Sequence, residues 1–244
     1  MPCRSVWPAF LAGLIGAVLG CSHPEPHPEP AMLTPEEQSA GWRLLFDGKT
    51  AAAWRGFKSE TLPAGWQVVD GALTRVAQAG DIVSKEEFQD FELALEWKVA
   101  PGGNSGIFYR VSEAPELEYV WQSGPEMQVL DDARHKDGQR PETSAGACYG
   151  LYPAPRGVVR PAGEWNQVRI VVQGNHVEHW LNQRKIVEYE LGSPDWQERV
   201  RRSKFAEMPR YGREPRGHLA LQDHGDWVAY RNIRIRVLDA KAGG

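Results

Sequence analysis

The chain has few cysteines, and none of them is expected to form a disulfide. Only three occur among 244 residues. Cys3 lies in a segment that we expect to be removed and Cys21 is the expected site of a lipid, so Cys148 has no partner. Small and apolar residues flank Cys148, with no base or cation beside it, which favours a buried structural thiol over a nucleophile. The hydrophobic core must therefore stabilise the fold.

The sequence also lacks a long apolar run and a block of one charge. No apolar stretch reaches the roughly 18 residues that a membrane-spanning helix needs. The 28 Lys and Arg residues face 32 Asp and Glu residues, a net charge of -4. Zinc-finger, P-loop and RNA-recognition motifs are missing. These absences argue against a nucleic-acid or nucleotide partner and leave attachment to a membrane, if any, to a lipid.

The first 20 residues have the pattern of a bacterial export signal. Arg4 gives a positive start, residues 6–19 are apolar, and residues 18–21 read Val-Leu-Gly-Cys, which resembles a lipobox. We predict a lipoprotein signal peptide over residues 1–20 and acylation of Cys21, with an ordinary secretory peptide as the alternative. Because Ser22 follows the cysteine, as in Gram-negative lipoproteins, we expect an anchor in the outer membrane, on its periplasmic or cell-surface face.

A proline-rich segment separates this signal from the rest of the chain. Residues 23–30 alternate Pro with His and Glu, so they cannot form a regular backbone ladder and should stay extended. The two histidines could bind a metal, but a solvated spacer is the simpler interpretation. We predict a tether over residues 21–37, with a capped helical turn at residues 34–37, and one domain over residues 38–240.

Alternation with a period of two dominates that domain. Residues 91–99 alternate large apolar side chains with Glu, Ala, Glu and Lys, which is typical of a half-buried strand. Similar patterns occur at residues 168–172, 219–221 and 233–237, and Asp-Gly pairs supply turns. The sequence therefore predicts an all-β sandwich of two antiparallel sheets. Only residues 194–205 are predicted to be helical.

Seven short motifs carry a resemblance to a known family. In order along the chain they are Leu45–Thr50, Gly103–Arg110, Glu126–Asp131, Gly163–Asn166, Trp180–Asn182, Leu221–Gly225 and Tyr230–Ile233. Together they resemble the 3-keto-disaccharide hydrolase domain family, over residues 38–238. The resemblance implies a concanavalin-like jelly roll that acts on glycosides whose C3 hydroxyl has been oxidised to a ketone. The departures, at residues 51–54 and 182–183, lie away from the expected site.

Strand alternation predicts which polar side chains share a face. Glu126 and Gln128 lie on one side of their strand, while Met127 and Val129 lie on the other. The same reasoning groups residues 106, 108 and 110, and residues 218, 220, 222 and 224. In a jelly roll these side chains would form a sugar-binding trough; solvated outer-face residues are the alternative. The predicted substrate-binding residues are Arg110, Gln128, Asn104, Gln222, His224 and Trp121, the last as a stacking platform.

Catalytic candidates follow from the strand at residue 126 and the loop after it. Asp132 and His135 lie in that loop, where they suit acid–base chemistry or binding of a divalent cation. The alternative is that they are a turn-forming Asp and an exposed His without a role in catalysis. The predicted catalytic residues are Glu126, His135 and Asp132, with one divalent metal ion as an open cofactor. Lys204 or Arg210 could reach an anionic intermediate, although residues 201–204 read as a solvated helix face.

The implied chemistry is cleavage by β-elimination. A ketone at C3 acidifies the C2 hydrogen, so Glu126 or His135 could remove it while Arg110, Gln222 or a metal ion holds the enolate oxygen. Subsequent addition of water would complete net hydrolysis. A laminarinase-type endo-glucanase is one alternative, disfavoured because Gln128 stands at the middle acid position. A carbohydrate-binding lipoprotein without activity is the other, disfavoured because it needs no titratable base.

Acylation of Cys21 is directly testable. We expect protein extracted from membranes to begin at Cys21 and to carry the mass of attached acyl chains, because the lipobox places cleavage before this residue. Mass spectrometry of the N-terminal peptide gives the answer. An unmodified terminus at another residue would exclude the lipoprotein.

Overall fold

A computed structural model describes residues 32–239 of the chain. The predicted signal peptide, Cys21 and most of the proline-rich tether lie outside the described residues, so they stay predictions. Among the described residues, no helix is long and apolar enough to cross a membrane.

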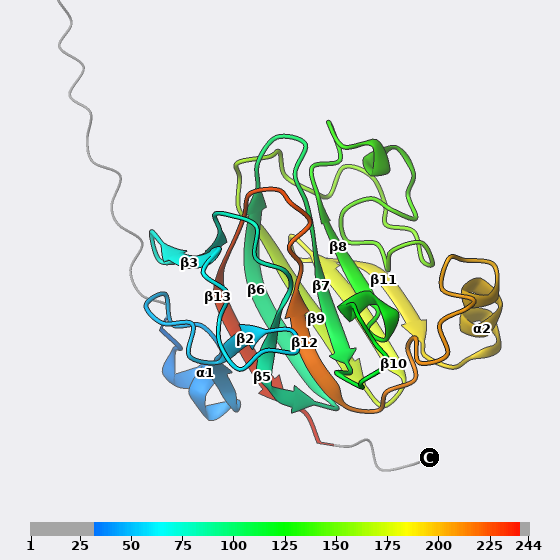
Figure 1. The fold of residues 1–244 in the computed structure, drawn as a ribbon, viewed down its shortest axis with the longest axis horizontal. Coiled ribbons are helices and arrows are strands. Elements are labelled where there is room, and N and C mark those ends of the chain that lie inside the picture. Colours follow the sequence, from blue (N-terminus) through cyan, green and yellow to red (C-terminus); the bar gives the residue numbers. More distant parts are fainter. Residues whose placement is uncertain (1–31, 240–244) are drawn as a thin grey trace, which may run out of the picture.

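The described chain folds into two antiparallel sheets (Figure 1). The larger sheet has the order β11 (Arg184–Glu190), β10 (His176–Leu181), β9 (Asn166–Gln173), β6 (Phe91–Val99), β13 (Val228–Val237), β4 (Ala72–Arg75) and β3 (Trp66–Val69), and β1 (Trp42–Leu44) also pairs with β13. The smaller sheet has the order β2 (Trp54–Gly56), β5 (Ile82–Phe88), β12 (Gly217–Leu221), β7 (Asn104–Val111) and β8 (Glu126–Leu130). The predicted all-β jelly-roll sandwich is confirmed.

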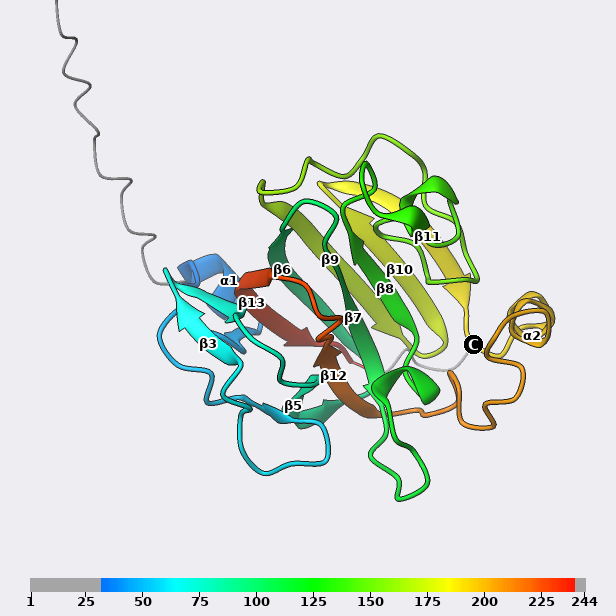
Figure 2. The same cartoon turned by 45° about the horizontal axis from the view of Figure 1, so that its top comes forward.

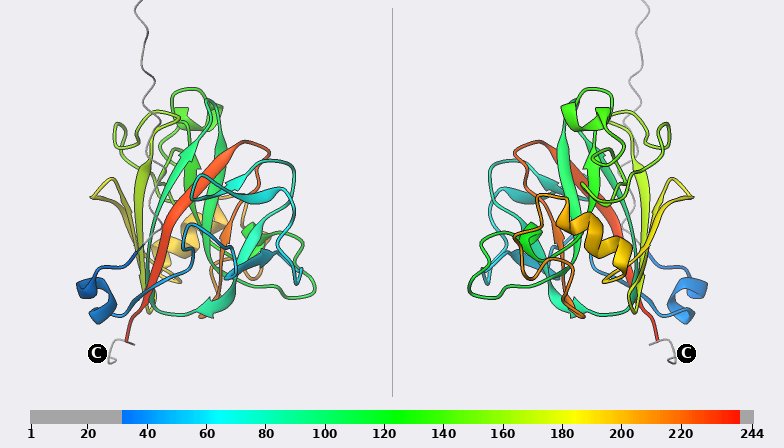
Figure 3. Two further views of the ribbon diagram at one scale, coloured as in Figure 1. Left: turned by 90° about the vertical axis from the view of Figure 1, so that its left-hand side faces the viewer. Right: turned by 90° about the vertical axis from the view of Figure 1, so that its right-hand side faces the viewer.

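The two sheets enclose one hydrophobic core, and the side views show them as two layers (Figure 3). On β6 the alternation is as predicted, because Phe91, Leu93, Leu95, Trp97 and Val99 are all buried in this core. From the smaller sheet, Ile107, Met127 and Leu219 meet them. Each buried large apolar side chain contributes roughly 1.5–3 kcal/mol of hydrophobic free energy.

Two α-helices lie at opposite sides of the sandwich (Figure 2). Helix α1 (Pro35–Ser39) begins with the predicted cap, in which the Thr34 hydroxyl accepts from Glu37 N and the Glu37 carboxylate accepts from Thr34 N. Helix α2 (Pro194–Arg201) begins at the predicted Ser193 but ends four residues before residue 205. The Ser203 hydroxyl accepts from the Phe205 backbone N–H, and this turn directs Phe205 into the core.

A strap over residues 144–149 covers the free edge of β8. Gly146 N donates to Gln128 O at 2.8 Å, and Tyr149 N donates to Glu126 O at 3.1 Å. Cys148 lies within the strap and is fully buried, and burial raises the pKa of its thiol to about 12. The prediction of a structural thiol is therefore confirmed.

A chain of buried polar groups supports the strap from below. His179 Nδ1 donates to Gly146 O at 3.0 Å, so its Nε2 accepts from the Tyr109 hydroxyl, also at 3.0 Å. The Tyr109 hydroxyl is in turn bonded to Tyr189, which lies 3.6 Å from the Cys148 sulfur. These groups satisfy one another inside the core, as buried polar groups must.

This arrangement predicts that the fold is sensitive to acid. Burial lowers the pKa of His179 to about 4, against about 6.5 in an unfolded chain. The neutral ring therefore stabilises the fold fully above pH 6.5, and this contribution falls by about 2 kcal/mol at pH 5. Urea unfolding at pH 7.5 and pH 5 should show this loss, and His179→Gln, which keeps both hydrogen bonds, should reduce it. An unchanged pH dependence in the variant would contradict a neutral buried imidazole.

Candidate active site

A pocket lies on the side of the smaller sheet that faces away from the core. Its volume is about 280 Å³, and its lining comes from β7, the 3₁₀ turn η1 (Val120–Gln122), β8, the strap, the segment after α2 and the loop after β12. The lining residues are Asn104, Trp121, Glu126, Gln128, Tyr149, Lys204, Gln222 and His224. Six of the nine residues predicted for catalysis or binding therefore meet in this pocket.

Strand register explains this convergence. In the pairing of β7 with β8, Gly106 lies opposite Gln128 and Phe108 lies opposite Glu126. Met127 and the other alternate residues enter the core, so the predicted shared face of Glu126 and Gln128 is confirmed. A Cβ atom at position 106 would lie 2.2 Å from Glu126 Oε1, so a larger residue would displace this carboxyl group. The missing side chain makes room for the carboxyl group.

The Glu126 carboxyl is an unusual acid. The residue is only 6% exposed, and burial raises its pKa to about 8, against the opposing effect of the Lys204 charge. Among the described residues no hydrogen bond to this carboxyl group lowers that pKa. A carboxyl group without a partner that faces a cavity is suited to exchange a proton with a ligand.

Lys204 brings a cation to the same pocket. Its ammonium lies 4.3 Å from the centre of the Tyr149 ring and 5.1 Å from that of Phe205. Desolvation lowers the pKa of Lys204, and the charge of Glu126 opposes that shift. The predicted helix does not extend to residue 204, because α2 ends at Arg201. Lys204 is exposed, as predicted, and its ammonium lies over the Tyr149 ring.

The two histidines of the site lie side by side. The rings of His135 and His224 are 6.5 Å apart and nearly perpendicular, and only His224 lines the pocket. His135 begins the 3₁₀ turn η2 (Lys136–Gln139), where its Nδ1 accepts from Asp137 N at 3.1 Å. The neutral ring of His135 therefore carries its proton on Nε2. This tautomer favours a hydrogen-bond donor at the pocket edge over the predicted base.

Amide side chains complete the inner wall. Asn104 is 4% exposed, and its Oδ1 is buried without a hydrogen-bond partner. Gln128 is fixed, since its Oε1 accepts from Val129 N at 3.1 Å. Gln222 lines the pocket while its backbone N–H donates to Gly106 O at 3.0 Å. Asn104 lines the pocket, and an amide side chain can both donate and accept hydrogen bonds to a ligand.

Trp121 lies at the outer wall of the pocket. One face of its ring is stacked on Tyr119, with centroids 5.1 Å apart and planes 9° apart. The Lys204 ammonium lies 5.9 Å from the Trp121 ring centre. Trp121 also packs against the apolar cluster around Phe108 on the outer face of the sheet. This fixed ring suits the predicted stacking role.

Arg110 is not in the pocket, which corrects its predicted position. β7 carries one extra residue against β12, since Val111 pairs with His218 and Phe108 pairs with Ala220. This bulge, with Arg110 at a φ of 53°, breaks the alternation on which the prediction rested. The guanidinium instead donates to Gln89 O at 3.0 Å and Gly174 O at 2.6 Å, where it joins two turns.

Asp132 is also outside the pocket. Its Oδ1 accepts from Ala145 N at 2.8 Å, so it supports the strap. Asp132 lines a separate cavity of about 530 Å³, together with Arg134 and Arg156. Asp132 was predicted to be catalytic because its loop directly follows β8. The chain instead turns away from the pocket after Leu130. Arg210 likewise pairs with Glu214 at 2.7 Å and does not line the pocket.

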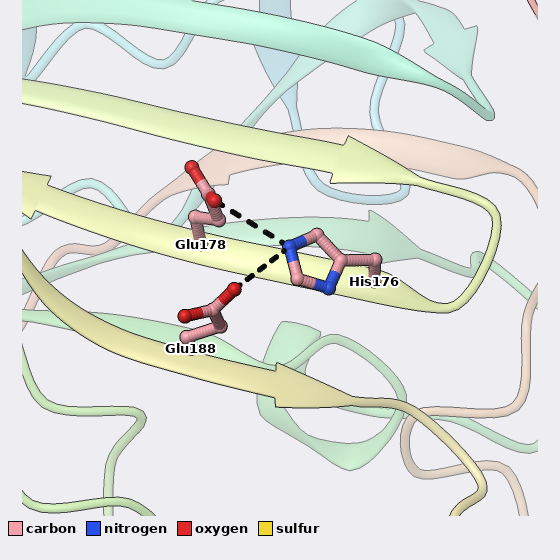
Figure 4. Close-up of side chains that lie close together, drawn as sticks. All are labelled: His176, Glu178 and Glu188. Carbon is pink, nitrogen blue, oxygen red and sulfur yellow. Dashed lines mark hydrogen bonds and ion pairs between the residues drawn. The ribbon is translucent and has the colours of Figure 1, made fainter.

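A cluster of side chains with the spacing of metal ligands occurs elsewhere among the described residues. His176, Glu178 and Glu188, on β10 and β11, have donor atoms close enough to share an ion (Figure 4). Lys185 already pairs with both carboxylates, at 3.2 and 2.7 Å. In the pocket, Glu126 and His224 are not joined by a third such donor in the described chain. The residues present do not form a set that fits the predicted divalent ion, and no chemical step is assigned to one.

Comparison with known proteins extends these observations. A family model, the 3-keto-alpha-glucoside-1,2-lyase-like domain, matches residues 41–236. A 3-keto-disaccharide hydrolase of Bacteroides thetaiotaomicron is 35% identical over 229 residues, covering 82% of this chain and 79% of that protein.

Solved structures share the whole fold. A candidate glycosyl hydrolase from Parabacteroides distasonis is 34% identical with a TM-score of 0.79, covering 86% of this chain and 100% of its own. A second one from the same organism is 32% identical with a TM-score of 0.64, covering 81% and 99%. The family model covers both sheets and every residue of the pocket. It confirms the resemblance carried by the seven motifs. The chain therefore belongs to the 3-keto-alpha-glucoside-1,2-lyase-like domain family.

Proposed function

We propose that this protein cleaves the glycosidic bond of 3-keto-glycosides by removing the C2 proton and eliminating the C1 oxygen. The observation that carries the proposal is the partner-free, desolvated Glu126 carboxyl group in a pocket of sugar-binding character. The 3-keto-disaccharide hydrolase among its relatives supports the choice of substrate. Addition of water to the unsaturated product would make the net reaction a hydrolysis.

Glu126 is assigned the role of base. A proton on C2 of a 3-keto sugar lies beside a carbonyl group, so a carboxylate of raised pKa can remove it. A base is most effective when its pKa lies near the working pH, and burial brings Glu126 to about 8. The positive charge of Lys204 favours the ionised form and offsets the negative charge that develops on the substrate.

The remaining lining residues hold the keto sugar. Asn104 and Gln222 offer amide groups to its hydroxyls, and His224 with His135 behind it offers imidazole donors. The free part of the Trp121 ring receives the apolar face of the sugar. His135 thereby keeps a place in the site as a donor, while Arg110 and Asp132 have none.

The pocket disfavours the two alternatives. An ordinary glycosidase needs two carboxylates that flank the bond, but the lining has only one, Glu126. Asp131 does not supply a second, because its carboxylate accepts from Gly102 N at 2.7 Å and Ala133 N at 3.1 Å. A binding module without activity would gain nothing from burying an unpaired carboxyl group, which costs free energy.

Oxidation at C3 should decide whether a substrate is cleaved. We expect purified protein to cleave a 3-keto-glucoside and to leave the matching unoxidised glucoside intact, because only the ketone acidifies the C2 hydrogen. Chromatography of the products, with and without a chelator, measures both activities and any need for a metal. Comparable cleavage of the two sugars would instead support the glucanase.

Removal of the base should abolish turnover without loss of the fold. We expect Glu126→Gln to lower kcat by roughly 10²-fold or more and to stop exchange of the C2 hydrogen with deuterated solvent. Glu87→Gln, at a carboxylate that is 47% exposed on β5, is the matched control. Thermal unfolding should be similar for all three proteins. A Glu126→Gln variant that still exchanges this hydrogen would move the base to another residue.

The pH profile should report the same group. Since the base must be ionised and burial raises the pKa of Glu126 to about 8, kcat/KM for a 3-keto-glucoside should rise as the pH increases toward that value. Rates across pH 6 to 9.5 give the profile. A rate that falls through this range would show that the protonated Glu126 is the active form and acts as an acid.

A further inference from the structure

A second cavity adjoins the pocket, and the two share a wall. Its volume is about 340 Å³, and Tyr149 and Lys204 line both cavities. The residues that line only the second cavity are Arg140, Glu142, Thr143, Gly150, Ser203 and Phe205. A ligand longer than one sugar ring could therefore extend from Glu126 past Lys204 into this space.

The lining of the second cavity suits a sugar ring. The hydroxyls of Thr143 and Ser203 are used within the protein, donating to Asp137 O at 2.7 Å and Val200 O at 2.8 Å. The charged side chains of Arg140 and Glu142 remain exposed and take part in no ion pair among the described residues. A pyranose has an apolar face for the aromatic ring of Tyr149 and hydroxyls for both charges.

This cavity is held open by fixed elements. Gly150 N donates to Glu142 O at 2.7 Å, which joins the two ends of the strap loop. The Tyr149 hydroxyl donates to Asp137 at 3.3 Å. Phe205 is buried and stacked on Tyr211, with ring centroids 4.0 Å apart. A preformed site of this kind costs little ordering free energy when a ligand binds.

Resting on the proposed function, we propose that the second cavity binds the leaving sugar of a 3-keto-disaccharide and that Lys204 protonates the departing oxygen. With the keto ring beside Glu126 and the other ring in the second cavity, the glycosidic bond crosses the shared wall. Lys204 is the only proton-carrying cation in that wall among the described residues. Its lowered pKa makes the ammonium a better acid than an ordinary lysine.

The elimination is balanced by these two residues. The C2 proton passes to the Glu126 carboxylate, and its electron pair forms the C1–C2 double bond. The C1–O bond breaks, and the oxygen leaves with the electron pair of that C1–O bond and takes a proton from the Lys204 ammonium. The products are a free sugar and a 1,2-unsaturated 3-keto sugar. Exchange with water then returns a proton to Lys204 and removes one from Glu126.

The subsite is tested by comparing leaving groups of different size. We expect Arg140→Ala and Glu142→Ala to raise KM for a 3-keto-disaccharide roughly 10-fold, with little effect on a methyl 3-keto-glucoside, which has no second ring. Arg134→Ala, in the separate cavity beside Asp132, is the matched control and should change neither. Equal effects on both substrates, or none on either, would overturn the subsite.

Lys204 is tested by the acidity of the leaving group. Lys204→Met should slow a methyl 3-keto-glucoside roughly 10²-fold but should slow a 4-nitrophenyl 3-keto-glucoside much less, since nitrophenolate leaves without a proton. Both substrates share the Glu126 step, so any effect on that base cancels in the ratio. Lys204→Arg, which keeps the charge but is a far weaker acid, should show the same discrimination.

Three outcomes are distinguishable. An equal loss on both leaving groups would overturn the role of Lys204 as the acid. If wild-type protein cleaves both keto-glycosides and the cavity variants do not discriminate between them, only the subsite fails. Wild-type protein that cleaves neither would overturn the proposed function, and the subsite with it.

Discussion

The register between β7 and β8 is the constraint on which the site depends. It sends Ile107 and Met127 into the core and leaves Glu126 beside Gly106 on the outer face. A slip of one residue would exchange the two faces of the strand, burying Glu126 in the core and exposing Met127. The free energy of burying the apolar face thus fixes the position of the carboxyl group, although that group contributes none of it.

The strap converts this strand edge into a pocket wall. It pairs with β8 through Gly146 and Tyr149, and the buried chain from His179 to Tyr189 supports it from the core. Tyr149 then holds the Lys204 ammonium against its ring. The charge that tunes Glu126 is therefore positioned by hydrogen bonds on the far side of the sheet, so a change in the core can alter the chemistry of the site.

The outer face of the larger sheet has a different composition. Its charges are paired along the strands, as in the bond from Arg231 to Glu96 at 2.6 Å, and its cations lie over tryptophans, as in Arg231 over Trp165 at 4.0 Å. On the smaller sheet, the Glu126 carboxyl group faces the pocket without a hydrogen-bond partner among the described residues. Paired charges stabilise a surface, whereas an unpaired carboxyl group in a cavity is available to a ligand.

The sequence by itself determined the sandwich, the face that Glu126 shares with Gln128, and the motifs that bring Asn104 and Gln222 to the same site. Alternation along a strand is a local property, so these features could be predicted. Only the tertiary structure decided the positions of Arg110, Asp132 and Lys204. A bulge against β12 diverts Arg110, and the Lys204 ammonium packs over the ring of Tyr149. Both positions therefore depend on residues far away in the chain. The raised pKa of Glu126 has the same origin, because desolvation depends on everything that surrounds the carboxyl group.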